Sequence, residues 1–258
     1  MGELFKAIAH AIREKEPVAV VTEVQGPNPG AKMLVGEETV SGSLGDEKLD
    51  SAVIENARGF LDMAQTGTRT YGPQGQGNSE EVEVFIQAFS QPPDMYVLGA
   101  VNLANAVVRL GKFLGYRVTV VDARKIFANQ ERFPEADEVV VQWPNEFLEA
   151  APISRRTAVV ILTHDPKFDI PILEFALKSP VGYLGAMGSR RTHEKRKANL
   201  REIGISDEQM ERIHAPLGLD LGARTPEETA VSIMAQIIAL RTGRSGGHLD
   251  EASGRIHA

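Results

Sequence analysis

The spacing of apolar residues divides the chain into two parts that meet near residue 91. In the first part, two amphipathic stretches alternate with short β-rich runs that are bounded by glycine, proline and asparagine. This pattern predicts helices at residues 4–13 and 48–66, and strands at 18–24, 32–35, 39–43, 68–71 and 81–89. We therefore expect a small N-terminal α/β domain over residues 1–90.

Beyond the proline-containing stretch 91–94, strands and helices alternate regularly. Strands are expected at 95–99, 117–121, 138–141, 157–163 and 181–184, and helices at 103–114, 170–177, 192–203 and 226–241. This alternation is typical of a parallel, doubly wound sheet. The sequence thus predicts an α/β protein whose second domain, at 95–242, is Rossmann-like and precedes a flexible tail at 243–258.

Composition narrows the function classes. The net charge of −7 argues against nucleic acid or an anionic membrane as a partner, and no apolar run approaches the roughly 18 residues of a membrane span. The start of the sequence lacks the pattern of a secretory signal, so we expect a cytoplasmic protein. The absence of cysteine excludes thiolate chemistry on this chain, and the histidine spacing predicts no metal site.

The first turn of the expected Rossmann-like domain has a damaged dinucleotide fingerprint. Gly99 follows a strand and precedes a helix, and Asp122 lies 23 residues later, where an acidic residue could bond a ribose hydroxyl. Val101, however, occupies the position of the glycine that lets a pyrophosphate approach the backbone. This turn therefore either binds a nucleotide weakly or serves only strand–helix packing.

His164 follows the expected strand 157–163, at the edge where open α/β sheets bind ligands. It could orient a ligand, act as an acid or base, or simply bond a neighbouring carbonyl. Since no nucleophile is fixed beside it in the sequence, we assign no catalytic residue.

The segment 185–191 is the sharpest feature of the sequence. Gly185 and Gly188 free the backbone at the end of a strand, Ser189 can cap the next helix, and Arg190 and Arg191 follow. Free N–H groups at a helix start attract anions, and arginine adds bidentate contacts to phosphate. Residues 189–202 carry six lysines and arginines against two glutamates, a local charge of +4 in an acidic chain. We interpret the start of this helix as an anion site, although a solvated basic helix face is the alternative.

A second glycine-rich loop, with Gly218, Asp220, Gly222 and Arg224, leads into the last helix. Two such loops at one sheet edge could close around one phosphorylated ligand. Alternatively, Asp220 and Arg224 could pair with each other and only lock the loop.

Several motifs carry a family resemblance. The stretches 183–191, 214–222 and 225–233, together with 30–35 and 42–45, resemble the xanthine dehydrogenase accessory (XdhC/CoxI) family, and the similarity extends over nearly the whole chain. The resemblance implies a role in the maturation of molybdenum hydroxylases. In that role the protein binds molybdopterin, the molybdenum cofactor, protects it during sulfuration and delivers it to the apoenzyme.

Two departures from the family pattern bear on the ligand. Many relatives have Gly-x-Gly where this chain has Gly99 and Val101, which disfavours NAD(P). Many also have Gly-Gly-Cys in the N-terminal domain, where this chain continues through Gly45 and Asp46 without a thiol.

The leading hypothesis is a cofactor-binding maturation factor rather than a catalyst. Its expected partners are a molybdenum hydroxylase apoenzyme, a separate sulfurtransferase and a second copy of the chain in a homodimer. An NAD(P)-dependent oxidoreductase that uses Gly99, Ala104 and Asp122 is the alternative, and an adaptor without ligand is a third. The expected cofactor-binding residues are Gly185, Gly188, Ser189, Arg190, Arg191, His164, Gly218, Asp220, Gly222, Arg224, Gly99 and Asp122.

Overall fold

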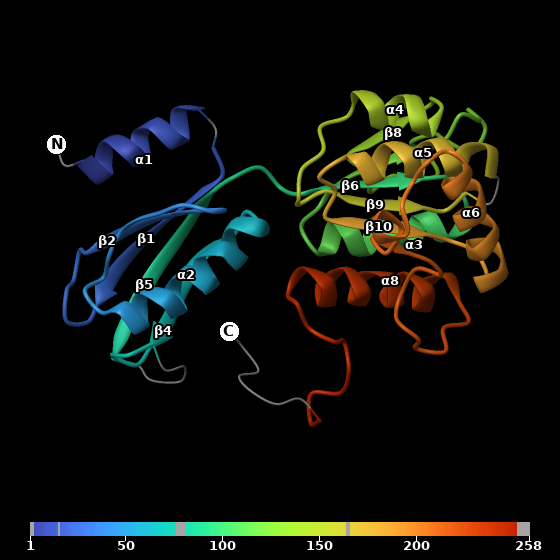
Figure 1. Cartoon of the computed structure of the whole chain (residues 1–258). Helices are drawn as coiled ribbons and strands as arrows, with labels where there is room; N and C mark the ends of the chain where they lie inside the picture. The colour runs from blue at the N-terminus through green and yellow to red at the C-terminus, as the bar shows by residue number, and fades with distance from the viewer. Residues whose placement is uncertain (1–2, 15, 76–80, 164–165, 252–258) are drawn as a thin grey trace. The chain divides into compact units, whose positions relative to one another are not determined.

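The computed structural model describes residues 3–14, 16–75, 81–163 and 166–251. The chain divides between Pro92 and Pro93 into two units, each with its own sheet and core (Figure 1).

The N-terminal unit contains a five-stranded antiparallel sheet with the strand order β3-β2-β1-β5-β4. Its elements are α1 (Glu3–Glu14), β1 (Val18–Gln25), β2 (Lys32–Gly36), β3 (Val40–Gly42), α2 (Glu47–Asp62), β4 (Thr66–Tyr71) and β5 (Val82–Phe89). Val82, Val84 and Ile86 alternate along β5 and are buried together with the apolar stripe of α2. This period of two is what fixes one face of an antiparallel strand against a helix.

The second unit contains a six-stranded sheet in which every pairing is parallel. Its strands are β6 (Asp94–Leu98), β7 (Arg117–Val121), β8 (Glu138–Val140), β9 (Ala158–Ile161), β10 (Tyr183–Ala186) and β11 (Ile213–His214), in the order β11-β10-β9-β6-β7-β8. Counted from β6, this is the Rossmann order 3-2-1-4-5-6 read from the β8 edge. The predicted α/β fold with a doubly wound, Rossmann-like domain is therefore confirmed.

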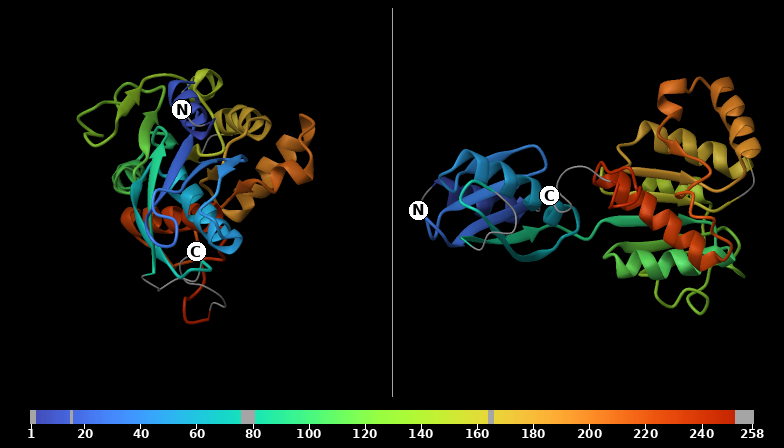
Figure 2. Two further views of the ribbon diagram at one scale, coloured as in Figure 1. Left: turned by 90° about the vertical axis from the view of Figure 1, so that its left-hand side faces the viewer. Right: turned by 90° about the horizontal axis from the view of Figure 1, so that it is seen from below.

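Helices cover both faces of the parallel sheet. They are α3 (Asn102–Phe113), α4 (Pro144–Ala150), α5 (Pro166–Lys178), α6 (Arg190–Glu202), α7 (Asp207–Met210) and α8 (Pro226–Arg241). The helices α3 and α8 pack against each other on one face, whereas α4, α5 and α6 follow one another in contact on the other (Figures 1 and 2).

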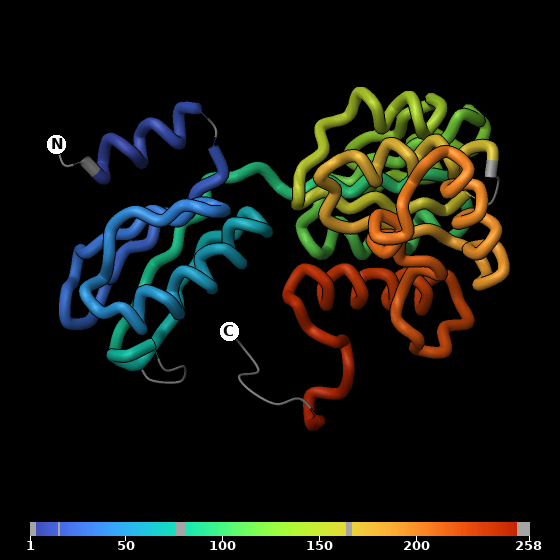
Figure 3. The backbone as a smooth tube through the Cα atoms, viewed as in Figure 1, coloured from blue at the N-terminus to red at the C-terminus, as the bar shows by residue number. Residues whose placement is uncertain are grey.

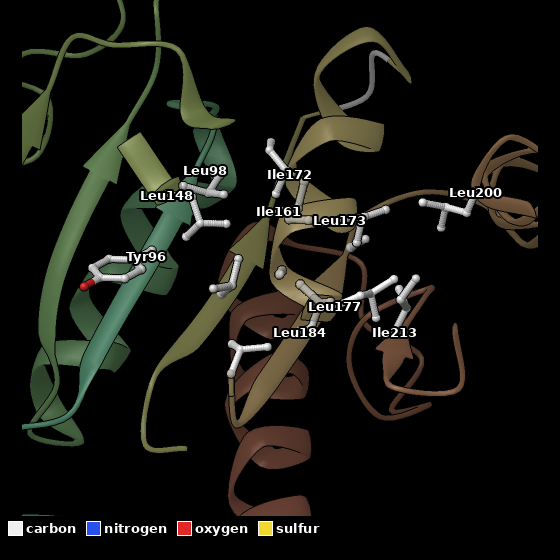
Figure 4. Packing of buried hydrophobic residues seen from close by; sticks show 14 of the residues in the cluster. Tyr96, Leu98, Leu148, Ile161, Ile172, Leu173, Leu177, Leu184, Leu200 and Ile213 are labelled. Atoms are coloured by element: carbon white, nitrogen blue, oxygen red, sulfur yellow. The ribbon is translucent and has the colours of Figure 1, made fainter. Parts of the chain in front are cut away.

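The core of the second unit lies between the sheet and α5. Figure 4 shows Ile172, Leu173 and Leu177 of α5 directed toward Ile161 of β9 and Leu184 of β10. Burying one such aliphatic side chain contributes about 1.5–3 kcal/mol. These contacts hold the C-terminal ends of β9 and β10 in place, and the candidate site begins at those ends.

The structure differs from the sequence-based elements at short or irregular segments. The helix expected at 48–66 ends at Asp62, because Ala64 adopts a positive φ of 52° and β4 begins at Thr66. The strand expected at 181–184 lies two residues later, so Gly185 belongs to β10 and not to the following loop. The short elements α4, α7 and β11 were not predicted.

Replacement of Ile161 by alanine tests the core. Ile161 has 0% exposure in β9, the strand between β6 and β10. We expect Ile161→Ala to lower the free energy of unfolding by about 2–5 kcal/mol, because the substitution removes buried contacts and leaves a cavity. The matched variant Ile126→Ala, at a side chain that is 77% exposed, should change it by less than about 0.5 kcal/mol. Urea denaturation measures both, and equal losses would contradict this packing.

Candidate functional site

The strand order of the parallel sheet reverses between β6 and β9, and the crevice at such a point is the usual ligand site of open α/β sheets. Gly99 follows β6 with a φ of +115°, and a Cβ built there would lie 3.1 Å from the backbone nitrogen of Thr163. The close approach of these two strand ends therefore already requires a glycine. The fold alone therefore explains why residue 99 is a glycine, without a bound nucleotide.

Asp122 lies at the end of β7, and its carboxylate accepts hydrogen bonds from other residues of the chain. Its Oδ1 accepts from the backbone N–H and Nε of Arg124, each at 2.9 Å. Its Oδ2 accepts from Arg124 Nη2 at 2.8 Å and from the N–H of Ala100 at 2.9 Å. Burial alone would raise the pKa of Asp122, but the hydrogen bonds from Arg124 and Ala100 hold this pKa below its usual value. A ribose hydroxyl would have to displace Arg124 to reach this carboxylate.

Helix α3 begins next to this turn without a side-chain cap. Val101 is its N-cap residue, in an extended conformation, and it offers no polar atom to the first-turn N–H groups. A ligand could complete this helix start, but the β-branched side chain stands where a dinucleotide needs a glycine. His164 lies outside the described residues, so its predicted role stays a prediction.

The loop after β10 leads directly into α6 and forms the candidate anion site, residues 188–191. Gly188 has a φ of +143°, and Ser189 caps the helix by accepting from the backbone N–H of Thr192 at 3.1 Å. The N–H groups of Arg190 and Arg191 belong to the first turn and have no acceptor inside the helix. This start of α6 therefore combines open donors with the positive end of the helix dipole.

Arg190 and Arg191 are both exposed, and neither forms an ion pair with any residue the structure describes. Three of the other four basic residues of α6 form ion pairs, whereas Lys195, like Arg190 and Arg191, forms none with a described residue. Lys197 pairs with Glu194, Arg201 pairs with Asp207, and Arg196 pairs with Asp169. Two cations at the positive end of a helix repel the helix dipole, and an anion bound there would relieve this repulsion.

Gly185 has a structural role of its own. A Cβ at this position would lie 2.5 Å from the hydroxyl of Tyr183, whose ring passes over the glycine. The hydroxyl donates to Gln236 of α8 at 2.8 Å, and the ring stacks on His214 with centroids 5.5 Å apart. Gly185 thus makes room for the Tyr183 ring, and nothing in its surroundings requires a ligand.

The loop with Gly218 and Gly222 is attached to α8. Gly218 donates to Gln236 at 2.8 Å, and a Cβ there would lie 2.4 Å from the hydroxyl of Ser232. Figure 3 follows this segment from β11 through residues 215–225 into α8. Asp220 and Arg224 are exposed, and within the described part of the chain they form no ion pair with each other. The predicted lock between these two side chains is therefore not formed, and both remain open to solvent.

Sequence reasoning missed the buried centre of this edge. Arg196 of α6 and Asp169 of α5 form an ion pair at 2.5 Å, with side-chain exposures of only 3% and 2%. Thr163 donates to the other oxygen of Asp169, and Arg196 also donates to the carbonyl of Met187 at 3.0 Å. The spacing of Arg196 from His193 and Leu200 on one helix face was the signal that could have found it.

The contacts therefore connect several of the candidate residues along one edge. Asp122 bonds to Ala100, Gly99 lies against Thr163, and the Asp169–Arg196 pair continues from Thr163 to the anion site. The loop at 218–224 is anchored separately, through Tyr183, Ser232 and Gln236.

Comparison with protein-family models matches this chain twice. The model described as the XdhC Rossmann domain matches residues 95–237, which is more than half of the chain, and the model of the XdhC and CoxI family matches residues 11–72. The chain belongs to the XdhC and CoxI family.

Relatives of this XdhC/CoxI chain include two named proteins. It is 30% identical to a probable xanthine dehydrogenase subunit of Bacillus subtilis over 63% of this chain and 47% of that protein. It is 39% identical to the "Molybdenum cofactor insertion chaperone PaoD" of Escherichia coli over 36% of this chain and 29% of that protein. The chain thus spans less than half the length of these curated relatives.

A solved structure shows the same fold. The crystal structure of a xanthine dehydrogenase from Bacillus halodurans superposes with a TM-score of 0.61 at 23% identity, and the match covers 93% of this chain and 67% of that chain. No helix in the described ranges is long and apolar enough to cross a membrane.

The XdhC/CoxI domain at the N-terminus closes its loop at 42–46 by internal hydrogen bonds. Asp46 caps α2 by accepting from the N–H groups of Lys48 and Leu49, and Asp50 accepts from Ser43 and from the N–H of Leu44. These contacts close the loop within the N-terminal domain.

Replacement of Gly185 by alanine tests its structural role. The added methyl would collide with the Tyr183 ring, so we expect a loss of about 1–3 kcal/mol in the free energy of unfolding. Gly59 lies inside α2 with no atom within 4 Å of the built Cβ, so Gly59→Ala should leave stability unchanged or raise it slightly. Denaturant unfolding compares the two, and a harmless Gly185→Ala would contradict the assignment.

Two histidines, the buried His193 and the half-buried His214, predict a pH dependence. Burial lowers the pKa of His193, the charges of Lys197 and Arg196 lower it further, and Glu194 raises it; burial also lowers the pKa of His214. Each depressed pKa means that the unfolded chain binds a proton first as the pH falls below about 6.5. The contribution of these histidines to the free energy of unfolding is therefore fully present above this pH. We expect the free energy of unfolding to decline from pH 7 to pH 5.

The His193→Gln variant isolates one of these groups. One proton of difference gives a slope of up to about 1.4 kcal/mol per pH unit, and the variant should show a shallower slope than the parent. Urea denaturation at pH 5, 6 and 7 measures it. Parallel pH profiles for parent and variant would show that His193 does not contribute.

Proposed function

We propose that this chain is a binding and maturation factor for the molybdenum cofactor of a molybdenum hydroxylase. One observation carries the proposal: two exposed arginines, with no ion pair to any described residue, lie at the start of α6, on the C-terminal edge of a parallel sheet. Such an arrangement suits a phosphate group, and the cofactor is a phosphorylated pterin. Family membership and the chaperone PaoD among the relatives support the same cargo.

The roles of the chain's own residues follow from their positions. The N–H groups of Arg190 and Arg191 would hold the phosphate at the helix start, and their guanidinium groups would close over it from solvent. Asp220 and Arg224, on the second loop, are exposed and would meet the more distant parts of the cargo, as would His164. Gly185 and Gly218 give room to the side chains of Tyr183 and Ser232.

The remaining steps require other proteins. Because the sequence contains no cysteine, it carries no persulfide, and sulfuration of a bound cofactor would need a separate sulfurtransferase. Delivery requires a molybdenum hydroxylase apoenzyme. A homodimer and a cytoplasmic location belong to the same proposal.

An NAD(P)-dependent oxidoreductase has the Rossmann strand order in its favour. Two features of the β6 and β7 ends oppose it. Val101 occupies the pyrophosphate approach, and all four acceptor positions of Asp122 are used within the chain. We therefore prefer the anion site at α6 over the first Rossmann turn.

The content of the purified protein tests the function. Isolated from cells that make the cofactor, the protein should carry molybdenum and a pterin, measured by elemental analysis and by chromatography of the released, oxidised pterin. Protein that contains bound NAD(P) and no pterin would favour the alternative. Protein free of both, and unable to take up the cofactor in vitro, would contradict the proposal.

The double variant Arg190→Ala/Arg191→Ala should lose this cargo. Each charge-assisted contact contributes about 1.5–3 kcal/mol, so affinity should fall by roughly two orders of magnitude or more. Thermal stability should hold or rise, because two cations leave the positive end of the helix. The control Lys195→Ala/Arg201→Ala removes the same charge from elsewhere on α6. Full retention of cargo in the Arg190→Ala/Arg191→Ala variant would show that the two arginines do not belong to the binding site.

A further inference from the structure

The face of α6 that packs against the sheet is unusual in its chemistry. Its buried positions are His193, Arg196 and Leu200, spaced three and four residues apart. A helix face that is directed at a core normally carries apolar side chains at this spacing. Here the two buried positions nearest the start of the helix are a histidine and an arginine, and only the third is apolar.

Arg196 bridges three segments that meet at the candidate site. Its Nη2 donates to Asp169 in the first turn of α5 and to the carbonyl of Met187 in the loop after β10. Asp169 in turn accepts from Thr163, which follows β9. One side chain therefore connects the edge of the sheet at β9 to the loop that leads into the anion site.

The guanidinium also lies close to the anion site itself. The Cβ position built at Gly188, the residue before the helix cap Ser189, is 3.8 Å from Arg196 Nη2. Over the described residues, Nη1 of Arg196 and Nδ1 of His193 are buried without a hydrogen-bond partner. A buried network that only holds a fold together is normally fully paired. In this network the guanidinium that lies near Gly188 keeps one nitrogen, Nη1, without a partner among the described residues.

We propose that Arg196 is a positioning residue for oxyanion binding at residues 188–191. Through Met187 it fixes the backbone of the loop, so that the N–H groups of Arg190 and Arg191 face the oxyanion together. Asp169, which itself accepts from Thr163, holds the guanidinium in that place. The inference rests on the anion site of the proposed function, and it concerns oxyanions generally, with phosphate as the simplest.

The test must separate positioning from folding, because Arg196→Met alone leaves Asp169 buried without a partner, which is strongly destabilising. The double variant Arg196→Met/Asp169→Leu replaces the pair by apolar side chains, an exchange that often leaves stability unchanged. Arg196→Lys keeps the charge, but the ammonium group ends a shorter side chain than the Nη2 that donates to both Asp169 and Met187. Lys195→Met removes one positive charge from the exposed side of the same helix and is the control.

The probe is inorganic phosphate, titrated into the full chain at constant ionic strength. Amide shifts of Arg190 and Arg191 in 15N–1H NMR spectra report occupancy, and urea denaturation of each variant reports folding. We expect the double variant to fold and to bind phosphate at least about tenfold more weakly than the parent, with much smaller shifts at both amides. Arg196→Lys should bind with intermediate affinity, and Lys195→Met should stay within about twofold of the parent.

Three results would overturn the proposal. The first is phosphate binding by the double variant with parental affinity and shifts, or by Arg196→Lys if the double variant does not fold. The second is an equal loss in Lys195→Met, which would reduce the effect to the total charge of α6. The third is a parent protein whose Arg190 and Arg191 amides do not respond to phosphate.

This result is independent of the cargo. Protein that binds phosphate in an Arg196-dependent manner but carries no molybdenum or pterin would refute the proposed function and leave the role of Arg196 standing. If the parent carries the cofactor and the double variant retains it fully, the proposed function would stand and the role of Arg196 would be refuted.

Discussion

The ion pair between Arg196 and Asp169 is the constraint on which the C-terminal edge of the parallel sheet depends. Two charges with 3% and 2% exposure are stable only when each is paired and hydrogen-bonded, so the pair fixes the distance between α5 and α6. Because Asp169 also accepts from Thr163 and Arg196 donates to Met187, the ends of β9 and β10 are held by the same two side chains. The apolar contacts among Ile161, Leu173 and Leu184 bring these elements together, but they are not directional (Figure 4). The polar pair determines which way the loop before α6 turns.

Much of the fold could be predicted because its longer elements carry consistent local signals. The helix α8 begins and ends where predicted, since Thr225, Pro226 and Glu228 form a capping box with proline at the first position. The elements that were missed lack such agreement. The strand β11 has two residues and forms only because β10 offers it an edge, and α7 has four residues and one capping box. The structure of such short segments depends on tertiary contacts, which a local sequence pattern does not reveal.

The structure shows contacts within the chain, at several of the predicted site residues, that the sequence did not indicate. Charged residues of α6 were all treated as one basic surface, whereas Arg196 is buried and paired with a residue 27 positions earlier. Gly185, Gly99 and Gly218 were assigned to ligand binding, although a side chain or a neighbouring strand occupies the space beside each. Asp122 was given a ribose hydroxyl, but Arg124, two residues away, fills that role. In each case the competing partner lies within the protein, and only the fold shows which partner is near enough.

Once these internal partners are assigned, the charges that remain define the chemistry more narrowly than the sequence did. Two acidic side chains at this edge, Asp122 and Asp169, are each paired with an arginine of the same chain. Arg190 and Arg191 have no such counter-charge among the described residues, and they stand at the positive end of α6. A net charge of −7 repels anions from most of the protein surface. A local positive site at the start of α6 would therefore select an anion by its placement in that site and not by the charge of the whole protein. An anion that binds here therefore has to match the geometry of the helix start, which favours a compact tetrahedral group such as phosphate over an extended acidic surface.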